Sequence, residues 1–393
     1  MLRFPDFEHN WESKKLKDLS NIQRGASPRP ITAKKWYDNE NKKVGWVRIG
    51  DVTSSSKYLT KTEDYFSEEG VKKSRFLPKG SLIMSICATI GKPIVTGMDT
   101  CIHDGFVGFS ELKNINKEFL YYYLNILEPK FISLSQTGSQ ANLNSDLVRN
   151  AEIGVPSIQE QEKIVNFISA VDKKHNILNK NLETQLSFKR YLMQQIFTQK
   201  LRFDFNDEWK NIPFKKLLKE VNEKTTVNNQ HEILSSTKEG IFTQKDYFAD
   251  RNVASKDNTG YKVLRKNQIV LSPQNLWMGN INVNTEFDIG IVSPSYKIYE
   301  TTDLIDINYF KHIVKLPRLI YEYTCASEQG ASIVRRNLNK QLFNEITIKV
   351  PSLNEQKKIG NLFDTCDEKI KNIDKNIQDM KEFKKGLLQQ MFV

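Results

Sequence analysis

One stretch of this chain occurs twice, and that repeat constrains the fold more than any other feature. Residues 155–197 read VPSIQEQEKIVNFISAVDKKHNILNKNLETQLSFKRYLMQQIF, and residues 350–392 read VPSLNEQKKIGNLFDTCDEKIKNIDKNIQDMKEFKKGLLQQMF. The two align without a gap at an offset of 195 (350 − 155), far above the period of solenoid or propeller repeats. The chain therefore consists of two halves, each ending in the same element.

Each copy of the repeat has the pattern of a long helix. Pro156 suits a first turn, and Ser157 and Ser352 are placed to cap the two helices, with Glu160 and Glu355 three residues later as in a capping box. A mostly apolar heptad then continues through both copies in one register. Two helices of about 40 residues, roughly 60 Å long, are expected to pair as a coiled coil. The alternative is two separate amphipathic helices, each lying on its own domain.

The heptad defines two seam positions in each helix. In the first copy they are occupied by Ile164, Val171, Leu178, Gln185 and Leu192, and by Ile168, His175, Leu182, Lys189 and Ile196. In the second copy they are occupied by Ile359, Cys366, Ile373, Met380 and Leu387, and by Phe363, Ile370, Ile377, Lys384 and Met391.

The duplication extends beyond the helices. An LRF tripeptide begins at Leu2 and again at Leu201, and a tryptophan follows each one, Trp11 or Trp209. The order is thus unit, helix, unit, helix. Two equal halves that exchange the same surface imply a pseudo-two-fold axis, which requires the long helices to pack antiparallel and to hold the units apart. We expect a first unit over 1–155, a helix over 156–200, a second unit over 201–350 and a second helix over 351–393.

The two units share an order of structural signals. Strand-like runs cover 44–49, 81–86, 102–109 and 151–155 in the first unit and 268–272, 290–299 and 345–350 in the second. Helical segments are predicted over 14–19, 117–127, 215–221 and 308–323, and a polar loop follows the longer helix of each unit, at 135–143 and 327–338. The predicted fold class is α/β (α+β), with two mixed units related by the pseudo-two-fold axis.

Composition places few limits on function. The N-terminal residues lack the apolar core of a signal peptide and no apolar run approaches a membrane span, so we expect a cytoplasmic protein. The four cysteines form no CxxC pair and are expected to be reduced thiols. Cys101 and His103 are able to bind a metal but lack a second ligand pair. The net charge of +11 suits contact with phosphate, and it equally suits an ordinary lysine-rich protein.

No catalytic motif survives a search of the sequence. The GxGxxG, P-loop, HExxH and GxSxG patterns are absent, as is the Asn/Asp-Pro-Pro-Tyr/Phe signature of amino-methyltransferases. Two stretches have nuclease-like spacing of acid and lysine, at 128–130 and at 160–163. The second lies on the repeated helix and is more simply a solvated face with first-turn charge. We therefore predict no active site and no cofactor in this chain.

Binding is the function that remains. Loops at matching places in the two units combine Arg and Lys with Ser, Thr, Asn and Gln, the side chains that read base edges and hold phosphates. For any one loop, the alternative is a plain solvated turn. The predicted DNA-binding residues of the first unit are Arg24, Ser27, Arg29, Lys34, Lys35, Arg48, Asp51, Thr53, Ser85, Ala88, Thr89, Lys92, His103, Gln136, Ser139, Gln140 and Asn142. Those of the second unit are Ser236, Lys238, Gln244, Lys245, Ser272, Gln274, Asn275, Trp277, Ser293, Ser295, Tyr296, Arg335, Arg336 and Asn337.

These features together resemble the specificity subunit of type I restriction–modification systems. The resemblance lies in VPSIQEQEKI and VPSLNEQKKI at the helix starts, LMQQIF and LLQQMF at their ends, and the tryptophans that open the units. The opening at 25–28 and the ATIG turn at 88–91 are also typical of the family. The second unit departs from it, with 274–279 in place of that turn and no proline-rich opening, so the two half-targets are expected to differ.

The resemblance implies two target recognition domains separated by an antiparallel coiled coil, each reading one half of a split, asymmetric double-stranded DNA sequence. It implies two methyltransferase partners recruited by the helices, with motor-nuclease subunits joining through the complex. S-adenosylmethionine, ATP and Mg²⁺ would bind those partners and not this chain. We expect an exposed apolar surface at the helix ends to serve as the partner-binding site, comprising Leu192, Ile196, Phe197, Leu387, Met391 and Phe392.

Two rival interpretations remain open. One is a stand-alone DNA-binding or scaffold protein without a methyltransferase partner. The other is a nuclease or methylase that acts alone, which would need the catalytic motifs that the sequence lacks.

Overall fold

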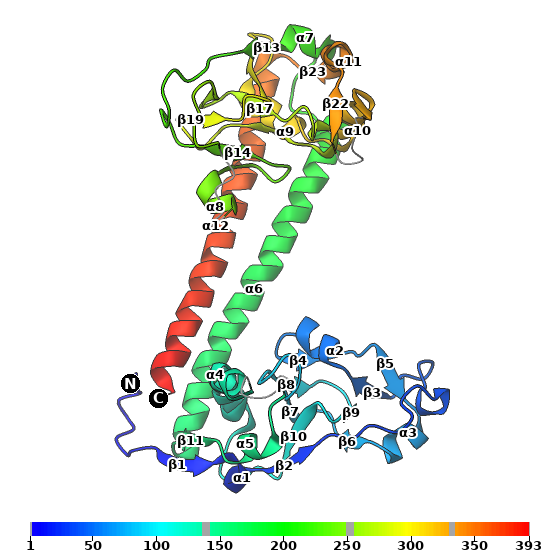
Figure 1. The fold of residues 1–393 in the computed structure, drawn as a ribbon, viewed down its shortest axis with the longest axis vertical. Coiled ribbons are helices and arrows are strands. Elements are labelled where there is room, and N and C mark those ends of the chain that lie inside the picture. The colour runs from blue at the N-terminus through cyan, green and yellow to red at the C-terminus, as the bar shows by residue number, and fades with distance from the viewer. Residues whose placement is uncertain (1, 136–141, 249–254, 330–334, 393) are drawn as a thin grey trace. The chain divides into compact units, whose positions relative to one another are not determined.

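The computed structural model describes residues 2–135, 142–248, 255–329 and 335–392. The chain forms two compact units, unit 1 comprising Met1–Lys180 with Lys375–Val393, and unit 2 comprising Asn181–Asp374. Helices α6 (Ile158–Phe197) and α12 (Leu353–Met391) each contribute one part to each unit (Figure 1). The predicted mixed α/β class is confirmed in both units.

Unit 1 contains seventeen elements before α6. In chain order they are β1 (Glu12–Lys15), α1 (Leu16–Leu19), β2 (Asn21–Arg24), η1 (Lys34–Trp36), β3 (Val44–Val47), α2 (Ile49–Ser54), β4 (Tyr58–Leu59), β5 (Asp64–Phe66), α3 (Glu68–Lys72), β6 (Arg75–Leu77), β7 (Leu82–Ser85), β8 (Pro93–Thr96), β9 (Thr100–Ile102), β10 (Phe106–Ser110), α4 (Lys117–Ser135), α5 (Ser145–Arg149) and β11 (Glu152–Val155).

The strands of unit 1 form two larger sheets and one pair. The first sheet has the order β2-β10-β7-β8-β4, antiparallel except that β4 runs parallel to β8. The second has the order β5-β3-β9-β6, in which the central strands β3 and β9 are parallel. Strands β1 and β11 pair antiparallel immediately before α6. The first strand of the unit is thereby joined to the start of the long helix.

Unit 2 begins and ends with a similar order of elements and differs between. They are β12 (Lys210–Pro213), α7 (Phe214–Leu217), β13 (Leu218–Val221), β14 (Leu234–Ser236), β15 (Ile241–Thr243), α8 (Gln244–Phe248), β16 (Lys262–Arg265), β17 (Ile269–Leu271), η2 (Leu276–Met278), β18 (Ile281–Val283), β19 (Ile289–Val292), β20 (Lys297–Thr301), α9 (Ile307–Ile313), α10 (Pro317–Cys325), β21 (Ser327–Gln329), β22 (Arg336–Leu338), α11 (Lys340–Glu345) and β23 (Thr347–Val350).

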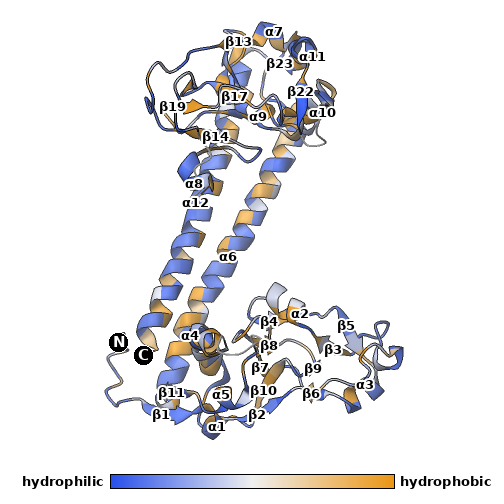
Figure 2. Ribbon diagram, viewed as in Figure 1, coloured by the Kyte–Doolittle hydropathy of each residue, from blue (hydrophilic) through white to orange (hydrophobic). Residues whose placement is uncertain are grey.

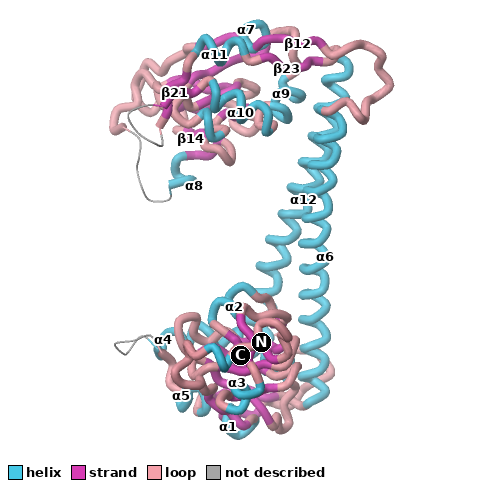
Figure 3. Tube along the Cα trace, turned by 90° about the vertical axis from the view of Figure 1, so that its right-hand side faces the viewer, coloured by secondary structure: helices cyan, strands magenta, loops and turns pink. Residues whose placement is uncertain are grey.

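Strand pairing shows that the two units are copies of one scaffold. The antiparallel order β13-β20-β17-β18 matches β2-β10-β7-β8. The pairs β14–β15 and β16–β19 are linked by a parallel bridge between Ile233 and Ile291, which reproduces the arrangement of β5-β3-β9-β6. The pair β12–β23 leads into α12 (Figure 3), as β1–β11 leads into α6 (Figure 1). The scaffold predicted to match between the halves is confirmed.

Alternating side chains of one central strand build the core on both faces of the first sheet. In β7, Leu82 and Met84 lie in the cluster formed with α4, whereas Ile83 lies in a second cluster with residues of the other sheet. In β17 of unit 2, Ile269 and Leu271 pack in the helix-side cluster and Val270 packs in the other. The position of a residue along the strand therefore determines which of the two hydrophobic clusters its side chain stabilises.

The long helices pair antiparallel inside each unit. In unit 1, Ile164 and Val171 near the start of α6 share a hydrophobic cluster with Leu387 and Met391 near the end of α12. In unit 2, Leu192 and Ile196 near the end of α6 share one with residues at the start of α12. Apolar and polar residues alternate along both helices (Figure 2), and every predicted seam position is buried or half-buried. This favours the paired arrangement over two separate amphipathic helices. Among the described residues, no helix combines the length and apolar character needed to cross a membrane.

Some predicted elements differ from those in the structure. The helix expected over 308–323 is two helices, α9 and α10, because Pro317 begins the second and disfavours helical geometry at the residue before it. The strand expected over 290–299 is interrupted by a turn, with Tyr296 N–H donating to the Ser293 carbonyl. The helices expected over 14–19 and 215–221 are single turns joined to strands.

The predicted capping boxes are also corrected. Ser157 Oγ accepts the Glu160 N–H at 3.3 Å, as a cap should, but the Glu160 carboxylate is buried and bonds elsewhere. It accepts two hydrogen bonds from Arg3, at 2.7 and 2.8 Å, and one from Trp11 Nε1 at 3.2 Å. The residue predicted to lie on a solvated face is therefore an internal anchor.

Unit 2 contains the same anchor. The buried Glu355 carboxylate accepts hydrogen bonds from Arg202, at 3.1 and 2.8 Å, and from Trp209 Nε1 at 3.2 Å. The glutamine that follows each glutamate is equally matched, since Gln161 Oε1 accepts Asn116 N–H and Gln356 Oε1 accepts Asp306 N–H, both at 2.7 Å. The repeated Glu-Gln pair thus joins each long helix to the segment before the first strand of its unit and to the start of α4 or α9.

Candidate nucleic-acid interface

Four of the predicted DNA-binding residues of unit 1 line one hollow of about 730 Å³, namely Ser27, Lys34, Arg48 and His103. The exposed Ile31 and the buried Trp46 also line the hollow. Ser27 Oγ donates to Asp104 Oδ1 at 2.9 Å, which joins the loop after β2 to the loop after β9. Hydroxyl, imidazole, ammonium and guanidinium groups therefore converge from separate loops.

The His103 ring in this hollow is suited to accept a hydrogen bond as a neutral imidazole and not to carry a positive charge. Burial lowers its pKa, and Nδ1 accepts the Gly105 N–H at 2.9 Å, which requires that nitrogen to be unprotonated. The nearby Asp104 carboxylate lies 3.8 Å from Nδ1, a contact that would be an ion pair only with a protonated ring. We favour the neutral ring because the backbone hydrogen bond is the shorter contact.

A second group of predicted residues gathers at the ATIG turn. Thr53 Oγ1 lies 3.4 Å from Thr89 Oγ1, and Lys92 Nζ donates to the Thr53 carbonyl at 3.3 Å. Ala88 has a φ of 55°, so the turn holds a non-glycine residue in the left-handed region. The loop after α2 and the loop between β7 and β8 therefore form one polar surface.

The same turn is joined to the polar loop that follows α4. A bridge pairs Cys87 with Asn142, and the Leu143 N–H donates to the Ile86 carbonyl at 2.7 Å. Asn142 is exposed beside the turn. Three other predicted residues of this loop, Gln136, Ser139 and Gln140, lie outside the described residues.

Unit 2 joins its corresponding loops in the same way. The Arg336 N–H donates to the Gln274 carbonyl at 3.1 Å, and the Arg336 guanidinium lies 4.4 Å from the centre of the Trp277 ring. Arg335 and Asn337 on either side are exposed. A cation stacked on an indole is held in one orientation, which suits a side chain that reads a base edge or stacks on a base.

The remaining predicted residues form less compact groups. In unit 2, Ser293 and Ser295 hydroxyls lie 2.9 Å apart in the turn before β20, and the hydroxyl of half-buried Tyr296 donates to the Ser236 carbonyl at 3.3 Å. Gln244 and Lys245 lie at the start of α8, Lys238 is exposed between β14 and β15, and Asn275 precedes η2. In unit 1, Arg24 donates to the Asp104 carbonyl at 2.6 Å, while Arg29 and Lys35 are exposed near η1.

Four predicted contacts are corrected, because their side chains serve the chain itself. Ser85, Ser236 and Ser272 are buried. Ser85 Oγ donates to loop carbonyls, and Ser236 Oγ donates to Asn280 Oδ1 at 2.7 Å. The half-buried Asp51 carboxylate accepts N–H groups from Arg48 at 2.8 Å and Glu63 at 3.0 Å. The side-chain oxygens of Ser85, Ser236 and Asp51 therefore form hydrogen bonds within the chain, and the expected exposure of these residues is wrong.

The expected exposed surface at the helix ends is also wrong. Leu192, Ile196, Leu387, Met391 and Phe392 are buried in the cores of their own units. Half-buried Phe197 packs against Tyr309 and Phe363, with ring centres 6.1 and 5.7 Å apart. The sequence shows that these positions are apolar in both copies, but the surface that covers them is part of the same chain.

The residues that the sequence offered for metal binding or nuclease chemistry lie in ordinary structural environments. Within the described residues, no group of three or more His, Cys, Asp or Glu side chains is placed to hold a metal ion. Cys101 is buried, and burial raises the pKa of its thiol to about 12, so it is an inert core residue. Glu128, in the first nuclease-like stretch, is half-buried inside α4, and burial raises its pKa.

Sequence reasoning missed several residues of the hollow in unit 1. Tyr37, Asn39 and Asp64 line it with the four predicted residues, and the Asp64 carboxylate pairs with Arg48. Only Asn39, in the polar stretch after Trp36, has a sequence context that would suggest a loop contact. Asp64 reaches the hollow through the pairing of β3 with β5, and Tyr37 through an isolated bridge to Phe66; sequence alone shows neither pairing.

Comparison with known proteins shows a similarity that covers the first unit. Residues 8–187 match the type I restriction modification DNA specificity domain. This similarity covers just under half of the chain. The matched segment includes both polar groups of unit 1 and most of α6, whereas the predicted DNA-binding residues of unit 2 lie outside it.

Relatives extend the similarity over the remaining chain. The type I restriction enzyme MjaIX specificity subunit of Methanocaldococcus jannaschii is 24% identical over 216 residues, covering 52% of this chain and 49% of that protein, so the chain matches about half the length of this relative. A protein of the same organism assigned as the MjaX specificity subunit is 23% identical over 418 residues, covering 98% and 93%. The crystal structure of the type I restriction–modification S subunit from M. genitalium has a TM-score of 0.60 at 15% identity, covering 98% and 96%, and shares the fold.

Proposed function

We propose that this chain is the sequence-specific DNA-recognition subunit of a type I restriction–modification complex, each domain reading one half of a bipartite, asymmetric target. Support comes from the family domain over residues 8–187 and from the polar, cationic loops that converge in each unit. The boundaries that we propose for the two recognition domains are 1–155 and 201–350, with spacer helices over 156–200 and 351–393.

The observation that carries the proposal is a shared scaffold with different side chains at the joined loops. Both units use the same strand order and the same buried Glu-Gln anchor. At the loop junction, however, unit 1 presents Thr89 and Asn142, whereas unit 2 presents Trp277 stacked under Arg336. Loops that lie at matching positions but carry different side chains are expected in two domains that recognise different half-targets.

Partner recruitment needs a surface other than the buried helix ends. Phe188 on α6 and Phe383 on α12 differ by the repeat offset of 195 (383 − 188), and both rings are about half exposed, at 49% and 51%. Exposed aromatic rings that recur at one position of a repeat are suited to bind two copies of one partner. We propose that they help to bind two methyltransferase subunits, which in turn bring the motor-nuclease subunits.

Under this proposal the chain itself is non-catalytic. S-adenosylmethionine, ATP and Mg²⁺ would bind the partner subunits, and the chain would contribute sequence recognition and assembly. The proposal predicts that the purified chain transfers no methyl group when it is incubated with DNA and S-adenosylmethionine in the absence of a partner.

Selection of binding sites from random duplex DNA tests the proposal. The purified chain, alone and with its methyltransferase, would be mixed with the library, and bound duplexes would be sequenced. We expect two short, different motifs separated by a fixed gap. Enrichment of a single contiguous motif, or of none, would contradict bipartite recognition.

The rival of a stand-alone DNA-binding protein is favoured by one observation, the burial of the helix-end residues that were expected to bind a partner. A pull-down separates the two functions. We expect the wild-type chain to retain the methyltransferase and the double variant Phe188→Ala, Phe383→Ala to lose it. Retention of the selected motif without any methyltransferase binding by the wild-type chain would establish the stand-alone function.

A further inference from the structure

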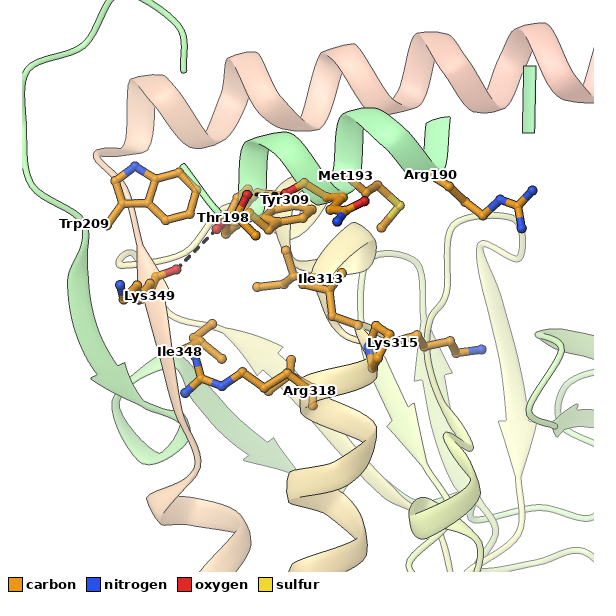
Figure 4. Close-up of a pocket in the computed structure, with 15 residues that line it drawn as sticks. Arg190, Met193, Thr198, Trp209, Tyr309, Ile313, Lys315, Arg318, Ile348 and Lys349 are labelled. Atoms are coloured by element: carbon orange, nitrogen blue, oxygen red, sulfur yellow. Dashed lines mark hydrogen bonds between the residues drawn. The ribbon is translucent and has the colours of Figure 1, made fainter. Parts of the chain in front are cut away.

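Unit 2 contains an apolar cavity of about 680 Å³ that the DNA-binding loops do not form. Its lining comes from the end of α6, from α9 and α10, and from β23, and includes Met193, Trp209, Tyr309, Ile313 and Ile348. In Figure 4, Ile313 and Ile348 lie between the long-helix residues and Arg318. A volume in this range is typical of cavities that take up a ligand or a large side chain.

The corresponding place in unit 1 is filled by the chain itself. Tyr123 lies seven residues after Asn116, and Ile313 lies seven residues after Asp306, the two residues whose N–H groups bond the matched glutamines. The ring of Tyr123 packs edge-on against Phe392, with centres 5.3 Å apart, and its hydroxyl accepts the Gly154 N–H at 3.0 Å. Isoleucine is too short to make either contact, so the replacement opens space in unit 2.

A second difference enlarges the opening. Gly154 of unit 1 corresponds to Lys349 of unit 2 by the repeat offset (349 − 154 = 195). A Cβ atom at Gly154 would lie 2.9 Å from the Trp11 ring, so glycine lets that tryptophan close over the strand. Lys349 has a Cβ and a long side chain, and Trp209 instead forms a wall of the cavity.

The rim of the cavity carries positive charge that the chain does not neutralise. Arg190, Arg318 and Lys349 are exposed lining residues, and within the described part of the chain none of them forms an ion pair with a carboxylate. Arg190 donates to Ser187 Oγ and Arg318 to the Thr347 carbonyl, both neutral acceptors. An apolar cavity with a cationic rim is complementary to an apolar group flanked by acids.

Two of the elements that line the cavity also carry exposed aromatic side chains outside the lining. Tyr191 follows Arg190 on α6 and is 56% exposed, and Tyr321 on α10 is 68% exposed. A small amphiphile inside the cavity would leave both rings in water, whereas a polypeptide that continues beyond the rim has further aromatic surface to contact. Tyrosine and arginine around an apolar recess are the residues that dominate protein interfaces.

We propose that this cavity docks an acidic segment of a partner protein by taking up an aromatic side chain, as unit 1 takes up its own Tyr123. The segment's carboxylates pair with Arg190, Arg318 and Lys349. Because unit 1 fills the corresponding place with Tyr123, this site distinguishes unit 2 from unit 1 for a partner. The inference does not rest on DNA recognition, and its test contains no DNA.

Selection from a displayed library of random short peptides tests the proposal. The full-length chain is the bait, and the variant Ile313→Tyr, which restores the side chain found in unit 1, is the counter-bait. We expect the enriched peptides to share an aromatic residue flanked by Asp or Glu. We also expect their affinity, measured by fluorescence anisotropy, to fall at least tenfold in Ile313→Tyr, with thermal unfolding no lower than that of the wild type.

Charge variants supply the matched control. Arg318→Glu should weaken the enriched peptides, whereas Lys216→Glu, an exposed lysine of α7 outside the lining, should leave them unchanged. Equal losses in the two variants would show non-specific attraction and overturn the site. Enrichment of peptides without an aromatic-acidic pattern, no enrichment at all, or binding of decanoate but of no peptide would each overturn it as well.

Discussion

Replacing Phe392 by alanine should destabilise unit 1, and replacing Phe383 by alanine should not. The two phenylalanines lie nine residues apart at the end of α12, yet Phe392 is buried and Phe383 is half exposed. Phe392 packs against Trp11, Phe119 and Tyr123, with ring centres 6.2, 5.1 and 5.3 Å apart. Loss of a buried phenylalanine ring from such a core costs about 3 kcal/mol. An exposed ring costs less than about 0.5 kcal/mol.

Native-state hydrogen exchange, read peptide by peptide, assigns the loss to one unit. A loss of about 3 kcal/mol corresponds to roughly 100-fold faster exchange of the most protected amides. We expect that acceleration in α4 and β11 of unit 1 for Phe392→Ala, with exchange in unit 2 unchanged. Phe383→Ala should leave both units unchanged and should instead weaken methyltransferase binding.

The reverse pattern would refute this reasoning. Unchanged exchange in Phe392→Ala would mean that the ring does not complete the core of unit 1. Loss of partner binding in Phe392→Ala with intact exchange would restore the helix end as an exposed docking surface.

Three further predictions follow from the anchors, the buried histidine and the loops. Arg202→Gln leaves the buried Glu355 carboxylate without its guanidinium, so hydrogen exchange should accelerate in unit 2 alone. His312 contacts Asp364 and Asp367, and burial lowers its pKa. As the pH falls, the unfolded chain therefore takes up a proton before the folded chain does, so unit 2 should lose stability below about pH 6.5. The variant His312→Gln should abolish this loss. Arg24→Ala should weaken DNA binding and reduce the slope of log affinity against log salt by about 1, whereas an unchanged slope would exclude a phosphate contact.

The sequence was sufficient for features that depend on periodicity and repetition. The heptad predicted the seam of both long helices, and the matched order of signals predicted a shared scaffold, because burial on one helix face imposes a spacing that is visible in the chain. Pro317 and the turn at Ser293 also interrupt the helix and the strand in which they were expected to lie. In the sequence, however, a residue that ends one element inside an otherwise regular pattern is easily assigned to a longer element.

Features that depend on long-range contacts were not predictable. The pattern of Ser157 and Glu160 predicts a capping box. Instead, the Glu160 carboxylate accepts hydrogen bonds from Arg3 and Trp11, which lie in the segment before β1. Apolar residues at the helix ends fit an exposed surface as well as a core, and only the fold shows that Phe392 meets Trp11. Likewise, Ser236 lies in a polar stretch of the sequence, but in the structure it belongs to a buried hydrogen-bond network with Asn280.

Adenine-methylation mapping across a genome tests the central claim most directly. A host that supplies the methyltransferase would carry no copy of this gene, the wild-type gene, or a variant with Trp277→Ala and Arg336→Ala in unit 2. We predict a gene-dependent split motif with two different halves around a fixed gap, and relaxation of one half only in the variant. The absence of any gene-dependent motif, or a change in both halves, would contradict the account.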